Sequence, residues 1–130
     1  MTTRSGRAIR VVIADDVEAL RSLLRTQLEL DDAFEVVGEA ADGRAAVEVV
    51  EETQPDFVLL DLAMPVMDGL QAIPGIRRVD PAAKIVVLSG FEASALAPAA
   101  FGAGADHFLE KTASLATIAE TLREINARSP

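Results

Sequence analysis

The sequence predicts an α/β fold in which a single parallel β-sheet carries helices on both faces. Five short apolar runs rich in Val and Ile alternate with five amphipathic segments. Such alternation with short connections is typical of a parallel sheet. The runs also show little alternation of polar and apolar residues, as expected for strands buried on both sides.

The length and composition of the chain favour one soluble domain. The 130 residues suit a single domain, which we expect to span residues 8–128 behind a disordered leader of residues 1–7. The formal net charge of −9 argues against direct nucleic-acid or anionic-membrane binding, because phosphates attract basic surfaces. No apolar run approaches the roughly 20 residues of a membrane helix. Cys is absent, which fits a reducing compartment, and we expect a cytoplasmic protein.

The first half of the chain contains three predicted strands and two predicted helices. Residues 9–14, 34–40 and 57–60 are apolar runs that predict strands. Residues 17–30 predict a helix, because helical spacing places five apolar residues on one face. These are Val17, Leu20, Leu23, Leu24 and Leu28. Residues 44–52 predict a second helix with Ala and Val available inward.

The second half contains the remaining elements. Residues 84–88 and 107–109 predict strands, and helical patterns cover residues 70–78, 93–101 and 114–127. The last helix begins after a Ser, which is a favoured N-cap residue.

Two prolines interrupt the predicted helices. Pro74, followed by Gly75, should shorten or kink the third helix, and Pro98 should break or delay the fourth. An interior proline costs about 3 kcal/mol because it removes a hydrogen bond and clashes with the preceding turn. We expect the Ala-rich segment 93–105 to be the least ordered part of the domain.

Polar residues gather at the C-terminal ends of the predicted strands. They are Asp15, Asp16, Asp61, Ser89 and Lys111. The carboxyl ends of parallel strands meet at one edge of a sheet, where ligands bind. Three carboxylates and one ammonium leave two excess negative charges, which a hard divalent cation would balance. Mg²⁺ is favoured because it needs only one or two carboxylates and commonly shares a phosphate.

Each of these residue types suits phosphoryl chemistry. A carboxylate such as Asp61 can attack a phosphoryl group and hold it as a mixed anhydride. A metal ion and Lys111 can balance the charge on the phosphoryl oxygens. The Ser89 hydroxyl can hydrogen-bond to the bound group.

Five motifs in register give the chain a specific resemblance. From about Ile9 to Ala127 it resembles a response-regulator receiver domain of bacterial two-component signalling. The motifs are Asp15-Asp16, the run Asp61-x-x-Met64-Pro65-x-Met67-Asp68-Gly69, Ser89-Gly90, Gly104-Ala105-Asp106 and Phe108-x-x-Lys111. The segments Val37-Gly38-Glu39-Ala40 and Asp42-Gly43 are similar to those of receivers that carry helix-turn-helix outputs and regulate transcription, although a stand-alone regulator stays open.

The resemblance implies a fold and a metal site. The fold is flavodoxin-like and doubly wound, with five strands in the order 2-1-3-4-5 and five helices. Asp61 would be the phosphoacceptor. Asp16 and Asp61 would ligate Mg²⁺ directly, Ala63 would contribute its backbone carbonyl, and Asp15 would act through water. Lys111 would pair with the acyl phosphate.

The resemblance also implies a switch and partners. Ser89 would turn inward to the phosphoryl group, and Phe108 occupies the place of the switching aromatic residue. The phosphoryl donor would be a sensor histidine kinase or a phosphotransfer protein. The fourth helix, fifth strand and fifth helix would form the output face toward a partner, an output domain or a second copy in a homodimer. Side chains at Ala63 and Phe91 would tune the lifetime of the phosphoryl group.

One departure from the family pattern follows Lys111. Thr112 stands where the family usually has Pro, often after a cis peptide bond. A cis bond before a residue other than proline costs about 3 kcal/mol, so the conformation of this bond is left open.

Other functions remain as alternatives. A small phosphatase with an Asp nucleophile usually has a second acidic residue two positions later as general acid, but Ala63 occupies that position. We therefore predict a switched signalling module with weak autophosphorylation and autodephosphorylation. A nucleotide or flavin module needs a Gly-, Ser- or Thr-rich loop after the first strand, whereas this chain has Asp15 and Asp16 there. Taken alone, that acidic pair could also be a helix cap.

Overall fold

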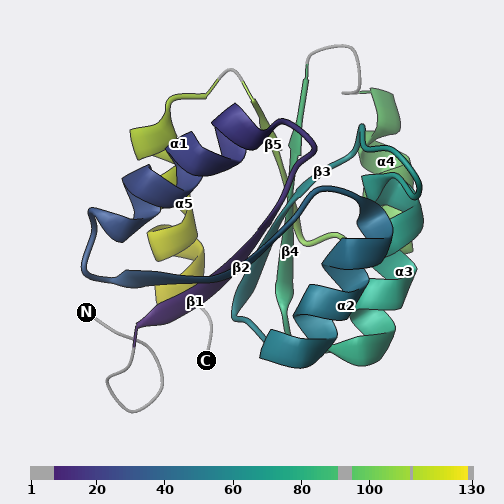
Figure 1. The fold of residues 1–130 in the computed structure, drawn as a ribbon, viewed down its shortest axis with the longest axis horizontal. Helices are drawn as coiled ribbons and strands as arrows, with labels where there is room; N and C mark the ends of the chain where they lie inside the picture. The colour runs from purple at the N-terminus through teal and green to yellow at the C-terminus, as the bar shows by residue number, and fades with distance from the viewer. Residues whose placement is uncertain (1–7, 91–94, 112, 129–130) are drawn as a thin grey trace.

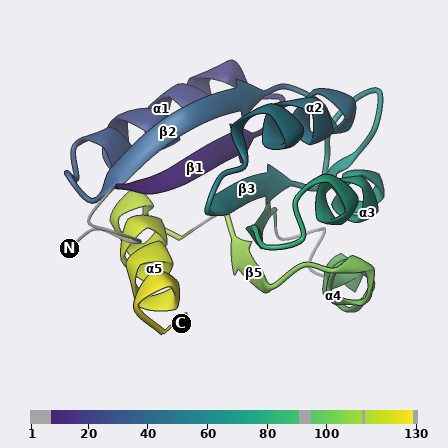
Figure 2. The ribbon, with the colours of Figure 1, turned by 90° about the horizontal axis from the view of Figure 1, so that it is seen from below.

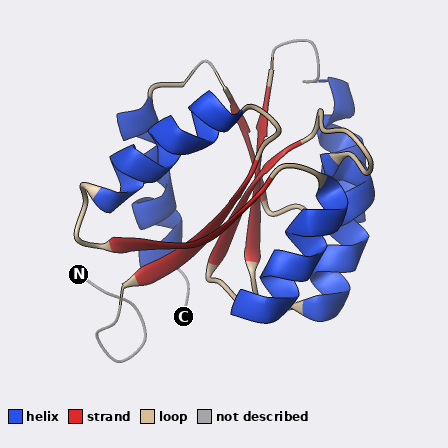
Figure 3. Cartoon of the chain, in the orientation of Figure 1, coloured by secondary structure: helices blue, strands red, loops and turns tan. Residues whose placement is uncertain are grey.

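Five parallel strands form one sheet in the computed structural model, which describes residues 8–90, 95–111 and 113–128. The strands are β1 (Ile9–Ala14), β2 (Phe34–Ala40), β3 (Phe57–Asp61), β4 (Lys84–Ser89) and β5 (His107–Glu110). Their order in the sheet is β2-β1-β3-β4-β5, and every neighbouring pair is parallel. The flavodoxin-like, doubly wound fold that the sequence implied is thereby confirmed (Figure 1, Figure 3).

The helices cover both faces of this sheet. They are α1 (Glu18–Glu29), α2 (Gly43–Thr53), α3 (Gly69–Val79), α4 (Ala97–Ala103) and α5 (Leu115–Arg128). The pair α1 and α5 lies on one face, while α2, α3 and α4 lie on the other (Figure 2). No described helix is long and apolar enough to cross a membrane.

The core consists of two apolar layers, one on each side of the sheet. Along β3, Val58 and Leu60 belong to the layer under α2, α3 and α4, whereas Phe57 and Leu59 belong to the layer under α1 and α5. All four side chains are 1% exposed or less. This two-sided burial explains why the strand sequences are continuously apolar.

Helix α1 buries a narrower face than its sequence predicts. Leu24 and Leu28 are buried, but Val17 is 49% and Leu23 is 56% exposed. The prediction that five apolar residues share one face is therefore wrong for Val17 and Leu23. Val17 precedes the helix as its N-cap residue, and Leu23 lies about 100° around the helix from Leu24, which directs it away from the sheet.

Helix α3 continues through its proline. The predicted shortening at Pro74 is wrong, since α3 is regular to Val79. Pro74 is exposed and deprives the helix of a single backbone donor. The fully buried Ala72, Ile73 and Ile76 hold the helix against the sheet on both sides of it.

Helix α4 begins late, as its proline predicts. The helix starts at Ala97 instead of residue 93, with Pro98 in its first turn, where its missing N–H has no intrahelical partner. The predicted cap of α5 is also confirmed, because the backbone N–H of Thr117 donates to Ser114 Oγ at 3.0 Å. The predictions for the leader of residues 1–7, for Phe91, for residues 93–94 and for the bond before Thr112 lie outside the described residues.

Candidate functional site at the carboxyl edge of the sheet

Three carboxylates meet at the C-terminal edge of the sheet. Asp15 and Asp16 follow β1, and Asp61 ends β3, which pairs with β1. Ligand oxygens of the three residues lie within 4.8 Å of one another. Asp15 and Asp61 are buried, whereas Asp16 is exposed. The structure therefore brings together the acidic residues that the sequence singled out and leaves one side of the cluster open to solvent.

Lys111 bridges two of these carboxylates. Its Nζ lies 2.9 Å from Asp15 Oδ2 and 3.1 Å from Asp61 Oδ2. Burial alone lowers the pKa of Lys111, but the hydrogen bonds to Asp15 and Asp61 outweigh burial and raise it. Lys111 thus remains an ammonium group at neutral pH and neutralises part of the cluster.

One ammonium does not compensate the whole cluster. Burial raises the pKa of Asp61, and the hydrogen bond from Lys111 opposes this effect while the charge of Asp15 adds to it. The net shift is upward despite the neighbouring cation. Asp61 therefore lies in an environment where a further positive charge would be stabilising.

The loop after Asp61 is held from both ends. The Ala63 N–H donates to Asp61 Oδ1 at 3.2 Å, and the Gly69 N–H donates to the Leu62 carbonyl oxygen at 2.9 Å. At the start of α3, Asp68 and Gln71 form a reciprocal capping box. Asp68 and Gly69 thus support the loop. Ala63 itself is exposed beside the carboxylates.

Ser89 and Phe108 lie on the neighbouring strands. Ser89 is 1% exposed at the end of β4, and its hydroxyl donates to the Gly90 carbonyl oxygen at 3.2 Å. The Ser89 carbonyl in turn accepts from the Lys111 N–H at 2.8 Å, which ties β4 to the chain segment that carries Lys111. Phe108 on β5 is half-buried, and its ring centroid lies 6.4 Å from that of Phe101 on α4.

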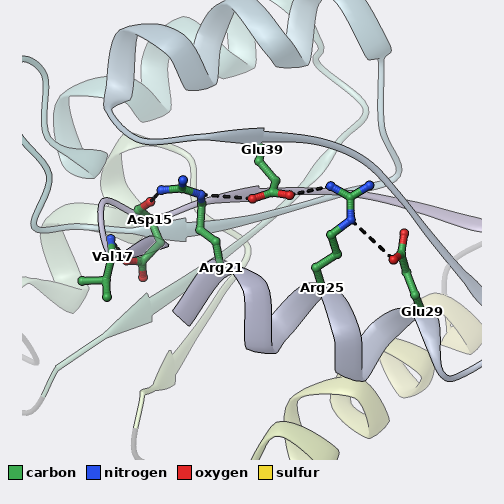
Figure 4. A network of polar contacts seen from close by, with 6 residues as sticks. All are labelled: Asp15, Val17, Arg21, Arg25, Glu29 and Glu39. Carbon is green, nitrogen blue, oxygen red and sulfur yellow. Dashed lines mark hydrogen bonds and ion pairs between the residues drawn. The ribbon is translucent and has the colours of Figure 1, made fainter. Parts of the chain in front are cut away.

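Arg21 and Glu39 also belong to this site, although sequence reasoning did not find them. Arg21 Nη1 donates to the Asp15 carbonyl oxygen at 2.6 Å, and its Nε donates to Glu39 Oε1 at 3.1 Å (Figure 4). Glu39 lies on β2, next to the end of β1 in the sheet. The opposite charges of the two residues gave no indication that they meet, because they are 18 positions apart.

The residues at this edge fit a hard divalent cation. Every candidate ligand is a carboxylate oxygen or a backbone carbonyl, and the cluster has an excess of negative charge. Mg²⁺ prefers this oxygen chemistry and is bound through one or two carboxylates. The acidic pair does not supply the N-cap residue of helix α1, which is Val17, and Asp15 Oδ1 accepts from the Val17 N–H.

Comparison with known proteins identifies a family. The family model of the response regulator receiver domain matches residues 11–123. The chemotaxis protein CheY of Thermotoga maritima is 38% identical over 117 residues, which cover 90% of this chain and 97% of that protein. The response regulator VraR of Staphylococcus epidermidis is 36% identical over 117 residues, but the match covers only 56% of it. The chain therefore spans just over half the length of this longer relative.

Solved structures agree with the sequence comparison. The signal receiver domain of NarL from Mycobacterium tuberculosis superimposes with a TM-score of 0.87 at 32% identity, covering 95% of this chain and 99% of that one. CheY in a CheX–CheY–BeF3–Mg²⁺ complex from Borrelia burgdorferi gives a TM-score of 0.83 at 28% identity, covering 93% and 91%. With its sheet order, its acidic cluster and its matched residues together, this chain belongs to the response regulator receiver domains of two-component signalling.

Proposed function

We propose that Asp61 is the phosphoacceptor of this receiver domain and that its phosphoryl donor is a phosphohistidine of a sensor kinase or phosphotransfer protein. The bridge from Lys111 to Asp15 and Asp61 carries this proposal, because it places a cation at the acceptor carboxylate. With such a kinase as its partner, we infer that the domain acts in the cytoplasm.

The metal would be Mg²⁺, held by Asp16 and Asp61 directly, by the Ala63 carbonyl and by Asp15 through water. The oxygen cluster and its excess negative charge support this assignment. The complex of the Borrelia burgdorferi relative contains Mg²⁺ and BeF3. Bound Mg²⁺ would supply positive charge next to the oxygens of the transferred phosphoryl group.

The transfer step begins at the Asp61 carboxylate, which Lys111 contacts. An Asp61 carboxylate oxygen attacks the phosphorus of the phosphohistidine, so an O–P bond forms as the N–P bond breaks. The electron pair of the N–P bond returns to the imidazole nitrogen of the donor. Lys111 already contacts Asp61 and would follow the new phosphoryl oxygens as an ion-pair partner. Water then attacks the phosphorus of the acyl phosphate, which regenerates the Asp61 carboxylate and releases inorganic phosphate.

Phosphorylation would be read by the face formed by α4, β5 and α5. Ser89 would rotate from the Gly90 carbonyl toward the phosphoryl group, and Phe108 would change its packing beside Phe101. Phosphorylation needs only to stabilise one of two states by a few kcal/mol to shift the population. The output would be a partner, an attached domain or a second copy of the chain.

The exposed Ala63 favours this switch over a phosphatase. An Asp-nucleophile phosphatase needs a proton donor near the leaving group, and a methyl side chain has none. We therefore infer slow loss of the phosphoryl group and no multiple turnover of phosphate esters. The domain would then be a signalling module whose chemical activity is limited to its own phosphorylation and dephosphorylation.

Incubation with Mg²⁺ and acetyl phosphate tests the proposal. The intact mass of the wild type should rise by one phosphoryl group, and Asp61→Asn should show no rise. The matched control is Asp32→Asn, which removes an exposed carboxylate outside the cluster and should leave the mass increase unchanged. Phosphorylation of Asp61→Asn, or continuous hydrolysis of a phosphate ester by the wild type, would contradict the proposal.

A further inference from the structure

The backbone of the acidic loop is fastened by one arginine. Arg21, in the first turns of α1, donates from Nη1 to the Asp15 carbonyl oxygen at 2.6 Å. The same guanidinium donates from Nε to Glu39 on β2 at 3.1 Å (Figure 4). A planar guanidinium can hold two acceptors in a fixed relative position. Arg21 thus connects the end of β1 to the edge strand β2.

A second arginine holds Glu39 in place. Arg25 Nη1 lies 2.5 Å from Glu39 Oε2, and Arg25 Nε lies 3.4 Å from Glu29 Oε1. Burial alone would raise the pKa of Glu39, but the hydrogen bonds from Arg25 and Arg21 outweigh burial and lower it. Glu39 therefore stays ionised and fixes the guanidinium of Arg21. Within the part of the chain that the structure describes, the Arg25 guanidinium bonds to Glu39 and Glu29 and not to Asp15.

The Asp15 carbonyl matters because it shares a peptide plane with the N–H of Asp16. The Asp15 N–H is bonded to the Ala40 carbonyl oxygen at 3.0 Å, and its side chain is held by Val17 and Lys111. Within the described residues, the exposed Asp16 side chain has no hydrogen bond of its own. The direction of the Asp16 carboxylate consequently depends on the orientation of the peptide before it.

We propose that Arg21 is a positioning residue of the magnesium site: with Glu39 it fixes the Asp15–Asp16 peptide so that both carboxylates face the cation before it binds. This inference rests on the proposed function, in which Asp16 is a direct ligand. Residues that orient metal ligands typically contribute ten- to hundredfold to affinity.

Loss of Arg21 should change the affinity for Mg²⁺ in opposite directions, depending on whether Arg21 acts by positioning ligands or only through its charge. A nearby positive charge repels a cation, so loss of the Arg21 charge alone would tighten Mg²⁺ binding. Loss of the hydrogen bond to Asp15 would weaken binding, because Asp16 would no longer be prearranged. The sign of the change in the dissociation constant therefore distinguishes the two roles.

The test measures the Mg²⁺ dissociation constant by isothermal titration calorimetry, without any phosphoryl donor. Arg21→Gln should bind Mg²⁺ about tenfold more weakly than the wild type. Arg123→Gln is the control, because it removes the same charge from an arginine on α5 that pairs with Asp31, outside the network of Arg21 and Glu39. It should stay within about twofold of the wild type, since screened surface charges contribute little.

Arg21→Lys keeps the charge but replaces the planar fork by a single ammonium group, which isolates geometry. Arg21→Lys should also weaken Mg²⁺ binding, but by less than Arg21→Gln. If Arg21→Gln does not fold, Arg21→Lys tests the positioning role in its place. Far-ultraviolet circular dichroism checks the fold of each variant. Unchanged or tighter binding by a folded Arg21→Gln, or by Arg21→Lys in its place, overturns the positioning role while the proposed function stands. Failure of the wild type to bind Mg²⁺ would overturn both.

Discussion

Gly43 and Met67 join the start of α2 to the loop that follows the phosphoacceptor strand. The Gly43 N–H donates to the Met67 carbonyl oxygen at 2.6 Å, and a Cβ at residue 43 would lie 2.2 Å from that oxygen. Gly43 is also the first residue of α2, directly after the Asp42 cap. The close approach of two backbones therefore requires a residue without a side chain at this position.

Replacement of Gly43 by Ala should destabilise the domain by roughly 2 kcal/mol or more, because the methyl group must displace backbone atoms of the loop. Urea unfolding followed by circular dichroism measures this change. The matched control is Gly102→Ala in α4, where a Cβ would meet nothing within 4 Å. Gly102→Ala should stabilise the domain by about 0.5–1 kcal/mol through helix propensity. Equal effects of the two substitutions would contradict the steric explanation.

Val66 adopts a backbone conformation that disfavours branched side chains. Its φ is +67°, and its side chain is 78% exposed in the loop after Asp61. Val66→Gly should raise the free energy of unfolding by up to about 1 kcal/mol, because relief of the left-handed strain exceeds the added chain entropy of glycine. Val17→Gly serves as the control, since Val17 is also exposed but has a φ of −92°. That substitution should destabilise the domain, and a gain in stability there would contradict the argument.

Asp61 stores unfavourable electrostatic energy in the unliganded domain. Burial raises the pKa of Asp61 above the ordinary value of 3.8. The raised pKa stabilises the folded domain in full only below pH 3.8, and this stabilisation is lost as the pH rises through the folded pKa. At pH 7, Asp61→Asn should therefore raise the free energy of unfolding, by about 1 kcal/mol. Mg²⁺ should stabilise the wild type and have little effect on the variant. A less stable Asp61→Asn protein without Mg²⁺ would show that the ion pair with Lys111 dominates.

Glu39 should have the opposite pH dependence. Its pKa is lowered from 4.5, because the hydrogen bonds from Arg25 and Arg21 outweigh the effect of burial. Its stabilising contribution is therefore present above pH 4.5 and is lost as the pH falls through the folded pKa. Glu39→Gln should be less stable than the wild type by about 1 kcal/mol at pH 7, and the difference should shrink below pH 4.5. A constant difference across the titration would indicate lost packing instead of lost charge.

Pro74 can be replaced with a gain in stability. It is exposed within the regular helix α3, where the Leu70 carbonyl has no N–H partner four residues later. Pro74→Ala should add this hydrogen bond and raise the free energy of unfolding, by at most about 3 kcal/mol. The midpoint of thermal unfolding, which measures this gain, should rise accordingly. Pro98→Ala in the first turn of α4 is the control, since no intrahelical bond is missing there. We expect a much smaller shift for that variant.

Local sequence patterns were sufficient to predict the elements of this fold. β1 and β2 have the predicted bounds, and the other elements differ mainly at their ends. Runs of Val and Ile are informative because a strand covered on both faces tolerates few polar residues. The acidic residues at strand ends were identifiable for a related reason, since a charge that directly follows a buried strand has few structural explanations.

Contacts between distant segments could not be predicted in this way. The helical pattern of α3 does not indicate that the Arg77 guanidinium donates to the Gly104 and Ala83 carbonyl oxygens and pairs with Asp106. Helical periodicity places a residue on one side of its helix but does not say what lies there. The same limit applies to Arg21 and Glu39.

The amino-acid sequence by itself determined the α/β class, the succession of strands and helices, and the residue types available for phosphoryl chemistry, because these follow from periodicity and from local charge. Only the tertiary structure decided that Lys111 bridges Asp15 and Asp61, that Arg21 holds the Asp15 carbonyl and that Gly43 must lack a side chain. These features depend on how closely segments far apart in the chain approach one another, which the packing of the whole domain sets and no local pattern encodes.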